Sequence, residues 1–172
     1  MGSLFLSQFS QRPRTVYISD PTWENHHAIF RHAGWETTTY RYYEAATNTL
    51  DLKGMLASIL DAPERSIFVL HPVGHNPTGI DPTLSQWTAI AWAFQAKAHF
   101  AFFDCAYQGF VSGEFAKDRR WVVLRLAWTH FSGPSNCSWS TAFLWLSARA
   151  CRRMLVCTAN AWVHCISSAV MK

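Results

Sequence analysis

The chain has 172 residues, of which 49% are hydrophobic, and a formal net charge of +4 at pH 7. This length suffices for one ordinary domain, and no uncharged apolar run approaches the ~20 residues that a membrane-spanning helix needs. The five cysteines suggest no disulfide framework, and the Cys-x-x-Cys spacing typical of zinc sites is missing. No secretory signal is expected, because the apolar run Leu4-Phe5-Leu6 is too short. We therefore predict a cytoplasmic location, with a mitochondrial origin left open.

Strands and helices are predicted to alternate along the first part of the chain. Short apolar runs bounded by turn formers predict strands at Thr15–Ser19, Thr37–Tyr43, Ser66–His71 and His99–Asp104. Helices are predicted at Trp23–Ala33, at Asp51–Asp61 with Asp51 as N-cap, and at Pro82–Lys97 with Pro82 near the first turn. This alternation predicts an α/β fold with a mostly parallel sheet.

A polar loop directly follows the predicted strand Ser66–His71. Open α/β sheets bind their ligands beyond the carboxyl ends of their strands, so this loop is a candidate binding segment. It contains the turn Asn76-Pro77-Thr78-Gly79, in which the proline presets its own φ and the glycine tolerates a positive φ. The turn is predicted to hold Asn76, an amide donor and acceptor, at the mouth of the sheet.

Two more segments complete a recognisable pattern. Pro21–Phe30 contains Trp23, and Phe102–Phe110 contains an aspartate at the end of an apolar run. With the Asn-Pro-Thr-Gly turn between them, these segments resemble the pyridoxal-phosphate (PLP) aminotransferases of fold type I, specifically the aspartate aminotransferase group. The resemblance runs from about Leu4 to about Lys117. It implies part of a three-layer large domain with PLP as cofactor.

The resemblance assigns three residues to the pyridine ring nitrogen. Asp104 would face this nitrogen and keep it protonated, which makes the ring an electron sink. His26 and His71 would lie behind Asp104 and hold its orientation and charge. The placement of Asp104 at the end of the run His99–Phe103 fits this role, because a strand end at this edge points into the site.

Three further residues are expected to contact the cofactor directly. Trp23 would lie flat on the ring, while Asn76 and Tyr107 would bond its phenolic oxygen. Each residue also has an ordinary structural explanation, in which Asp104 caps a helix and Trp23 is core, but the ordered set of motifs favours the cofactor site. A metal site formed by His71 and the nearby His75 is disfavoured, because the intervening proline argues against a helix that would align them. We predict no metal.

The lysine that this chemistry requires is missing. PLP enzymes need a lysine to form the Schiff base and to move a proton, and the family carries it in the signature Ser-x-Ser-Lys-Asn-x-Gly-Leu-Tyr-x-Glu-Arg-Val-Gly. Between Lys117 and Lys172 the chain has no lysine. The signature arginine, the upstream phosphate loop and the C-terminal small domain are also expected to be missing. We therefore predict no catalytic residue in this chain and only weak PLP binding.

Composition changes abruptly near residue 118. Residues 1–118 hold all 11 acidic residues, and residues 119–172 hold none. No periodic pattern continues through this boundary, and seven scattered basic residues without a motif give only a weak indication of nucleic-acid binding. We therefore predict a partial aminotransferase large domain over residues 1–118, followed by an irregular, non-homologous tail over residues 119–172 without a packed core.

A reading-frame shift explains the tail. A coding sequence permitted for Arg152–Ala169, read from the last base of the first codon, translates as Lys-Asn-Ala-Gly-Leu-Tyr-Ser-Glu-Arg-Val-Gly-Ala-Leu-His-Leu-Val-Ser. This is the missing signature. Only the first base of each recovered codon is free, so chance agreement at nine signature positions is very improbable. We infer that the tail is an out-of-frame translation, for which an unspliced insert is one possible cause.

Two classes of function stay open from the sequence. The first is an aspartate aminotransferase, truncated here, that moves an amino group between L-aspartate and 2-oxoglutarate. Its partners would be small amino and keto acids, with no nucleic acid and no membrane, and the family is homodimeric. The second is a non-catalytic fragment with the same fold that serves as an interaction module. The missing lysine favours the second for this chain, whereas the motifs favour the first for its ancestry.

Overall fold

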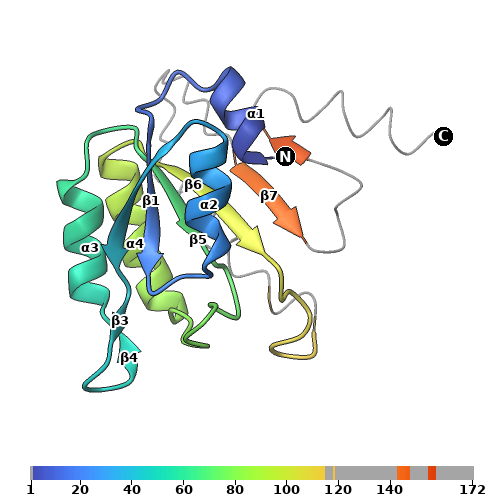
Figure 1. Ribbon diagram of the computed structural model, residues 1–172. Coiled ribbons are helices and arrows are strands. Elements are labelled where there is room, and N and C mark those ends of the chain that lie inside the picture. Colours follow the sequence, from blue (N-terminus) through green and yellow to red (C-terminus); the bar gives the residue numbers. More distant parts are fainter. Residues whose placement is uncertain (1, 115–117, 119–142, 148–154, 158–172) are drawn as a thin grey trace, which may run out of the picture.

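The computed structural model describes residues 2–114, 118, 143–147 and 155–157 (Figure 1). Its main sheet has six strands in the order β2-β1-β5-β6-β7-β8. These strands are β1 (Thr15–Asp20), β2 (Glu36–Arg41), β5 (Ile67–Leu70), β6 (Phe100–Cys105), β7 (Phe143–Ser147) and β8 (Leu155–Cys157). Every pairing is parallel except that of β7 with β8. The predicted α/β fold with a mostly parallel sheet is therefore confirmed.

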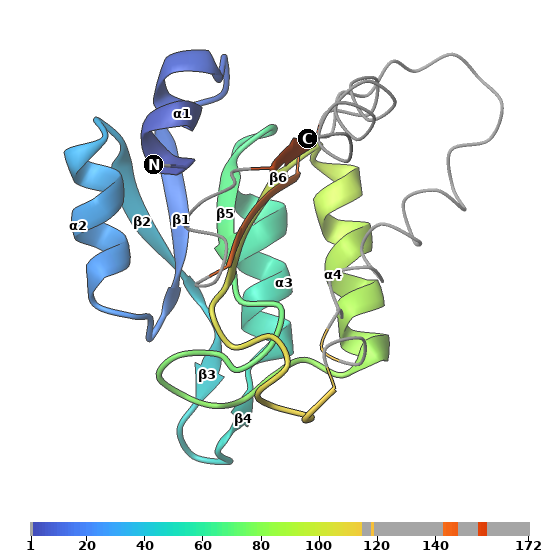
Figure 2. The ribbon, with the colours of Figure 1, turned by 90° about the vertical axis from the view of Figure 1, so that its right-hand side faces the viewer.

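Helices cover both faces of the sheet, which gives the three predicted layers. Figure 2 shows α1 (Gly2–Phe9) and α2 (Asn25–His32) on one side, and α3 (Leu52–Asp61) and α4 (Leu84–Ala96) on the other. Side chains of β5 alternate between the two cores: Phe68 and Leu70 pack with α3 and α4, whereas Ile67 and Val69 pack with α1 and α2. All four are buried, which explains why this strand has an uninterrupted apolar sequence. Among the described residues, no helix is long and apolar enough to cross a membrane.

Local capping sets where two helices begin. Asp51 is the N-cap of α3, as predicted, and its carboxylate accepts a hydrogen bond from the Gly54 N–H at 2.8 Å. The next helix starts later than predicted, because Thr83 and Gln86 form a capping box at its N-terminus. Pro82 therefore precedes the cap instead of lying in the first turn.

The capping box gives a stability prediction. We expect Thr83→Ala to lower the free energy of unfolding by about 1 kcal/mol, since the hydroxyl satisfies the Gln86 N–H. Thr83→Ser keeps the hydroxyl and should stay close to the parent. Urea unfolding followed by circular dichroism measures the difference; equal values for the alanine and serine variants would contradict the capping role.

In the first part of the chain, helix α1 and a small hairpin were not predicted from the sequence. Helix α1 is anchored by a hydrogen bond from the buried Trp35 Nε1–H to the Ser3 carbonyl at 3.0 Å, a contact that sequence periodicity does not reveal. The predicted strand Thr37–Tyr43 ends early at Arg41, and β3 (Tyr43–Glu44) pairs instead with β4 (Thr49–Leu50) in a small hairpin. The hairpin forms a separate two-stranded sheet.

The tail differs from the expectation of an irregular segment. Strand β7 pairs in parallel with β6, with Asp104 opposite Leu146, and β8 pairs with β7. The expectation is therefore wrong for these two short segments. The physical reason is that β6 offers an unpaired edge of N–H and C=O groups, and the apolar run Phe143–Ser147 satisfies it. The domain boundary near residue 118 and the frame-shifted origin of the tail stay predictions.

Candidate functional site: a carboxylate and histidine cluster at the sheet edge

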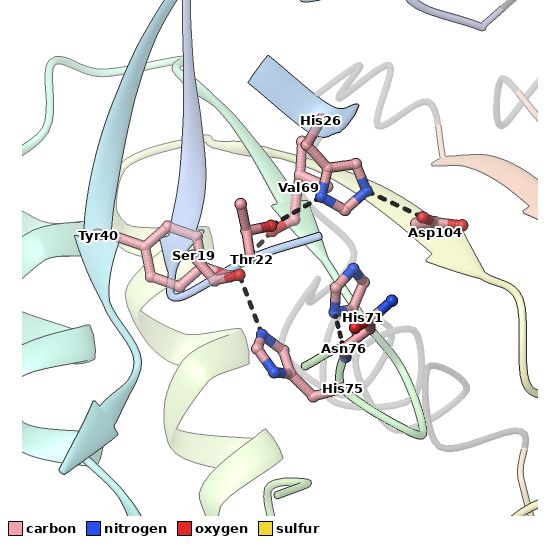
Figure 3. A network of polar contacts seen from close by, with 9 residues as sticks. All are labelled: Ser19, Thr22, His26, Tyr40, Val69, His71, His75, Asn76 and Asp104. Atoms are coloured by element: carbon pink, nitrogen blue, oxygen red, sulfur yellow. Dashed lines mark hydrogen bonds and ion pairs between the residues drawn. The ribbon is translucent and has the colours of Figure 1, made fainter. Parts of the chain in front are cut away.

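The candidate site lies where the parallel strands β1, β5 and β6 end. Three connections leave the sheet at the carboxyl ends of these strands. They are residues 21–24 after β1, residues 71–83 after β5, and the segment that begins at Ala106 after β6. Parallel neighbours place their carboxyl ends together, so side chains far apart in sequence meet here. Figure 3 shows the polar network that results.

Asp104 and His26 form the central contact. His26 Nε2 lies 2.9 Å from Asp104 Oδ2, and His26 Nδ1 lies 2.7 Å from Thr22 Oγ1 (Figure 3). A carboxylate only accepts hydrogen bonds, so His26 Nε2 carries a proton and donates it to Asp104 Oδ2. The histidine is buried, but the Asp104 side chain is 25% exposed. His26 thus orients the Asp104 carboxylate, whose side chain stays partly accessible to a ligand.

His71 and His75 extend the cluster on the β5 side. The His71 ring centroid lies 5.2 Å from that of His26 and 4.6 Å from that of His75. Burial, with the nearby imidazoles, lowers the pKa of His71 to about 4 and that of His75 to about 3. Both rings are therefore neutral at pH 7, and they add no positive charge beside Asp104.

His75 connects the loop after β5 to the end of β1. Its Nε2 lies 3.0 Å from Ser19 Oγ and its Nδ1 lies 2.8 Å from Thr78 Oγ1. Its ring also stacks on Tyr42, with the centroids 3.7 Å apart and the planes at 13°. The turn that carries Asn76 is thereby tied to the end of β1, and Figure 3 shows the contact of His75 with Ser19.

Asn76 and Tyr107 lie in two loops that touch each other at Gly74. The Asn76 N–H donates to His71 Nδ1 at 3.3 Å, so this amide sits directly beside the histidine cluster. Tyr107 is 43% exposed, and a Cβ placed on Gly74 would lie 3.0 Å from its Cβ. The loop after β6 therefore rests on the loop after β5.

Trp23 completes the set on the β1 side. Its ring packs edge-on against His26, with centroids 5.4 Å apart and planes at 90°, and its side chain stays 38% exposed. The structure thus brings Trp23, His26, His71 and Asp104 together with the main chain of Asn76, and it places Tyr107 on the adjacent loop against Gly74. Their binding roles stay predictions.

Sequence reasoning missed three supporting residues. Thr22 precedes His26 by four positions, a spacing that a helix-start argument would have found. Ser19 and Thr78 bind His75, but the contact from Ser19 spans 56 residues, and no local pattern signals it.

The cluster also has the composition of a metal site. One ligand atom from each of His26, His71 and Asp104 lies within 4.8 Å of the others. However, His71 Nδ1 accepts the Asn76 N–H, so the proton of the neutral ring is on Nε2, which then has no lone pair for a metal. The hydrogen-bonding pattern favours an oriented carboxylate over a metal centre.

The donor set suits a protonated aromatic nitrogen heterocycle such as the PLP ring. An oriented, accessible carboxylate can bind the ring N–H, Tyr107 and Asn76 supply hydrogen bonds, and Trp23 offers an exposed aromatic face. These are the groups that the sequence resemblance assigns to the cofactor ring.

Comparisons with known proteins identify the family of this chain. Residues 2–130 match the family described as Aminotransferase class I and II. The mitochondrial aspartate aminotransferase of Schizosaccharomyces pombe is 52% identical over 114 residues, which cover 66% of this chain and 26% of that protein. The cytoplasmic aspartate aminotransferase of Saccharomyces cerevisiae is 53% identical over 118 residues, which cover 69% of this chain and 28% of that protein.

Solved structures give the same result. The structure of aspartate aminotransferase from Saccharomyces cerevisiae cytoplasm matches with a TM-score of 0.75 and 40% identity, over 98% of this chain and 41% of that one. An aromatic-amino-acid aminotransferase from Burkholderia pseudomallei, covalently bound to pyridoxal phosphate, matches with a TM-score of 0.72 and 36% identity, over 85% of this chain and 33% of that one. The chain thus spans roughly a quarter to two fifths of these relatives. It belongs to the class I and II aminotransferase family.

Proposed function

We propose that this chain is part of a PLP-dependent aspartate aminotransferase, which transfers an amino group between L-aspartate and 2-oxoglutarate. The observation that carries the proposal is the series of hydrogen bonds from Thr22 through His26 to Asp104. It holds a carboxylate at the carboxyl end of β6. The relatives named as aspartate aminotransferases support this choice of substrate.

Each residue of the site has its own role in holding the cofactor. PLP, when bound, supplies an electron sink for the substrate. Asp104 holds the proton on the ring nitrogen, and His26 keeps the carboxylate aimed at it. Tyr107 and Asn76 donate hydrogen bonds to the phenolic oxygen, while the exposed face of Trp23 excludes water from one side of the ring.

A second candidate function is a non-catalytic fragment. The observation in its favour is the missing lysine, because proton transfer at the substrate needs this base. Lys97 does not replace it. It follows α4 as the C-cap and precedes β6, so it lies at the amino end of the strand whose carboxyl end carries Asp104. Lys117 falls outside the described residues.

The remaining assignments follow from the family. Small amino and keto acids are the proposed substrates, with a homodimer as the proposed assembly and no role in nucleic-acid binding. The similar relatives include both cytoplasmic and mitochondrial proteins, so the cytoplasmic location stays a prediction.

Pyridoxamine 5'-phosphate tests the ring site without requiring a lysine. We expect the full chain to bind it weakly, with partial quenching of tryptophan fluorescence, and we expect Asp104→Asn to weaken binding at least tenfold. The reason is that a hydrogen bond between charged groups is worth about 1.5–3 kcal/mol, and 1.4 kcal/mol is tenfold in affinity. Calorimetric titration gives the dissociation constants.

The matched control is Asp61→Asn, which changes an exposed carboxylate at the end of α3. It should bind the probe as the parent does. Equal binding by the parent and Asp104→Asn, or no binding by the parent at millimolar probe, would contradict the proposed cofactor site.

A further inference from the structure

Two carboxylates accept hydrogen bonds from the main chain of the loops after β5 and β6, which carry Asn76 and Tyr107. Asp81 Oδ2 accepts a hydrogen bond from the Gly74 N–H at 2.8 Å, and its Oδ1 accepts one from the His75 N–H at 2.9 Å. These two N–H groups immediately precede Asn76 in the chain. The carboxylate therefore fixes the backbone from which the Asn76 side chain projects.

Asp118 does the same for the loop after β6. Its Oδ2 accepts from the N–H groups of Gly109 at 2.7 Å and Val111 at 3.3 Å, and its Oδ1 accepts from the Ser112 N–H at 3.2 Å. Tyr107 lies two residues before the first of these donors. Each loop thus wraps its main-chain donors around one carboxylate, in the manner of an anion site built from backbone.

Neither carboxylate has a cationic partner within the described part of the chain, where the ion pairs join other residues. Asp118 is fully buried. Burial by itself raises the pKa of its carboxyl group, but the hydrogen bonds from Ser112, Gly109 and Val111 outweigh it and hold the pKa below the usual value. The main-chain donors are thus what keeps this buried charge in place.

The two loops meet at Gly74. This residue has φ +64°, and a Cβ on it would lie 3.0 Å from Tyr107 Cβ and 3.1 Å from Val111 Cγ2. The residue whose N–H binds Asp81 is therefore the one on which Tyr107 rests, and the N–H of the neighbouring Val111 binds Asp118. The site at Gly74 has no room for even a Cβ, so a shift of either loop toward the other must displace it.

We propose that Asp81 and Asp118 are positioning residues that act as a pair, through the contact of Gly74 with Tyr107 and Val111, to fix Asn76 and Tyr107 relative to each other. The ligand part of this proposal rests on the proposed function, since Asn76 and Tyr107 would share one oxygen of the cofactor ring. The coupling of the loops does not depend on it.

Amide hydrogen exchange of the ligand-free full chain tests the coupling. In Asp118→Asn we expect exchange to rise about tenfold at Gly109 and Val111, and also at Gly74 and His75 in the other loop. Asp81→Asn should produce the reciprocal pattern. The factor corresponds to the loss of one charge-assisted hydrogen bond. The amides of β5 and β6 should keep their protection. A rise confined to the mutated loop, or an equal rise in β5 and β6, would overturn the pairing in favour of separate or purely structural roles.

Binding of pyridoxamine 5'-phosphate tests the positioning. Each single variant should weaken binding about tenfold, and the double variant should weaken it little further, because either change already releases the shared contact. The control is Asp51→Asn, which alters the N-cap of α3 and should leave affinity unchanged. If the parent binds the probe and both single variants bind equally well, the positioning role is wrong. If the parent itself does not bind, the proposed function fails, and the exchange experiment alone decides whether the two loops are coupled.

Discussion

Purified protein of this sequence, supplied with PLP, aspartate and 2-oxoglutarate, is expected to form no glutamate. The residues around Asp104 are proposed to bind the ring, but the lysine of the family signature, which would carry the catalytic proton, is missing from the sequence. Restoring the reading frame ahead of the Arg152 codon, together with the parts of the relatives that this chain does not span, should produce aspartate-dependent glutamate formation. A coupled dehydrogenase assay measures the rate.

The control for this experiment is the restored protein with the recovered lysine changed to alanine, which should lose turnover while keeping the rest of the signature. Turnover by the unmodified chain, or an inactive restored protein that nevertheless folds and binds PLP, would show that the frame-shift explanation of lost activity is wrong. Sequencing the transcript across the codons for Asp118 to Arg153 tests the shift itself.

The second large effect is acid destabilisation. His71 and His75 have folded-state pKa values lowered to about 4 and about 3 by burial, against about 6.5 in an unfolded chain. Because the unfolded state binds protons first as pH falls, the stability from these neutral rings is complete above pH 6.5 and is lost as pH falls toward the folded values. We expect the free energy of unfolding to fall by about 4 kcal/mol between pH 7 and pH 5.

Buried histidines elsewhere act in the same direction. Burial lowers the pKa of His99, so the whole chain should be acid-sensitive, and variants are needed to separate the contributions. His75→Gln replaces the titrating ring with a neutral side chain and should reduce the pH dependence by about 1–2 kcal/mol over this interval. His32→Gln, at an exposed position of α2, is the control and should keep the parent's dependence.

Urea unfolding at a series of pH values gives these free energies. A parent whose stability is constant from pH 7 to pH 5 would contradict the burial of neutral histidines at the site. A parent that is acid-sensitive while His75→Gln keeps the full dependence would assign the effect to other groups.

The sequence alone determined the elements on which the site depends. The apolar runs predicted β1, β5 and β6, and turn chemistry placed Asn76 just beyond the second of these strands. Strand period, strand ends and turns depend on neighbouring residues, so they can be inferred locally. The three motifs in their order then identified the family and the residues of the candidate site.

Only the tertiary structure decided how those residues meet. The contact of His26 with Asp104 spans 78 residues, and that of His75 with Ser19 spans 56. Such contacts depend on which strands are neighbours and on their register, neither of which local sequence specifies. The same reason explains why the pairing of β7 with β6 and the backing of both loops by Asp81 and Asp118 could not be predicted: the open strand edge and the main-chain donors that these groups satisfy exist only once the sheet has formed.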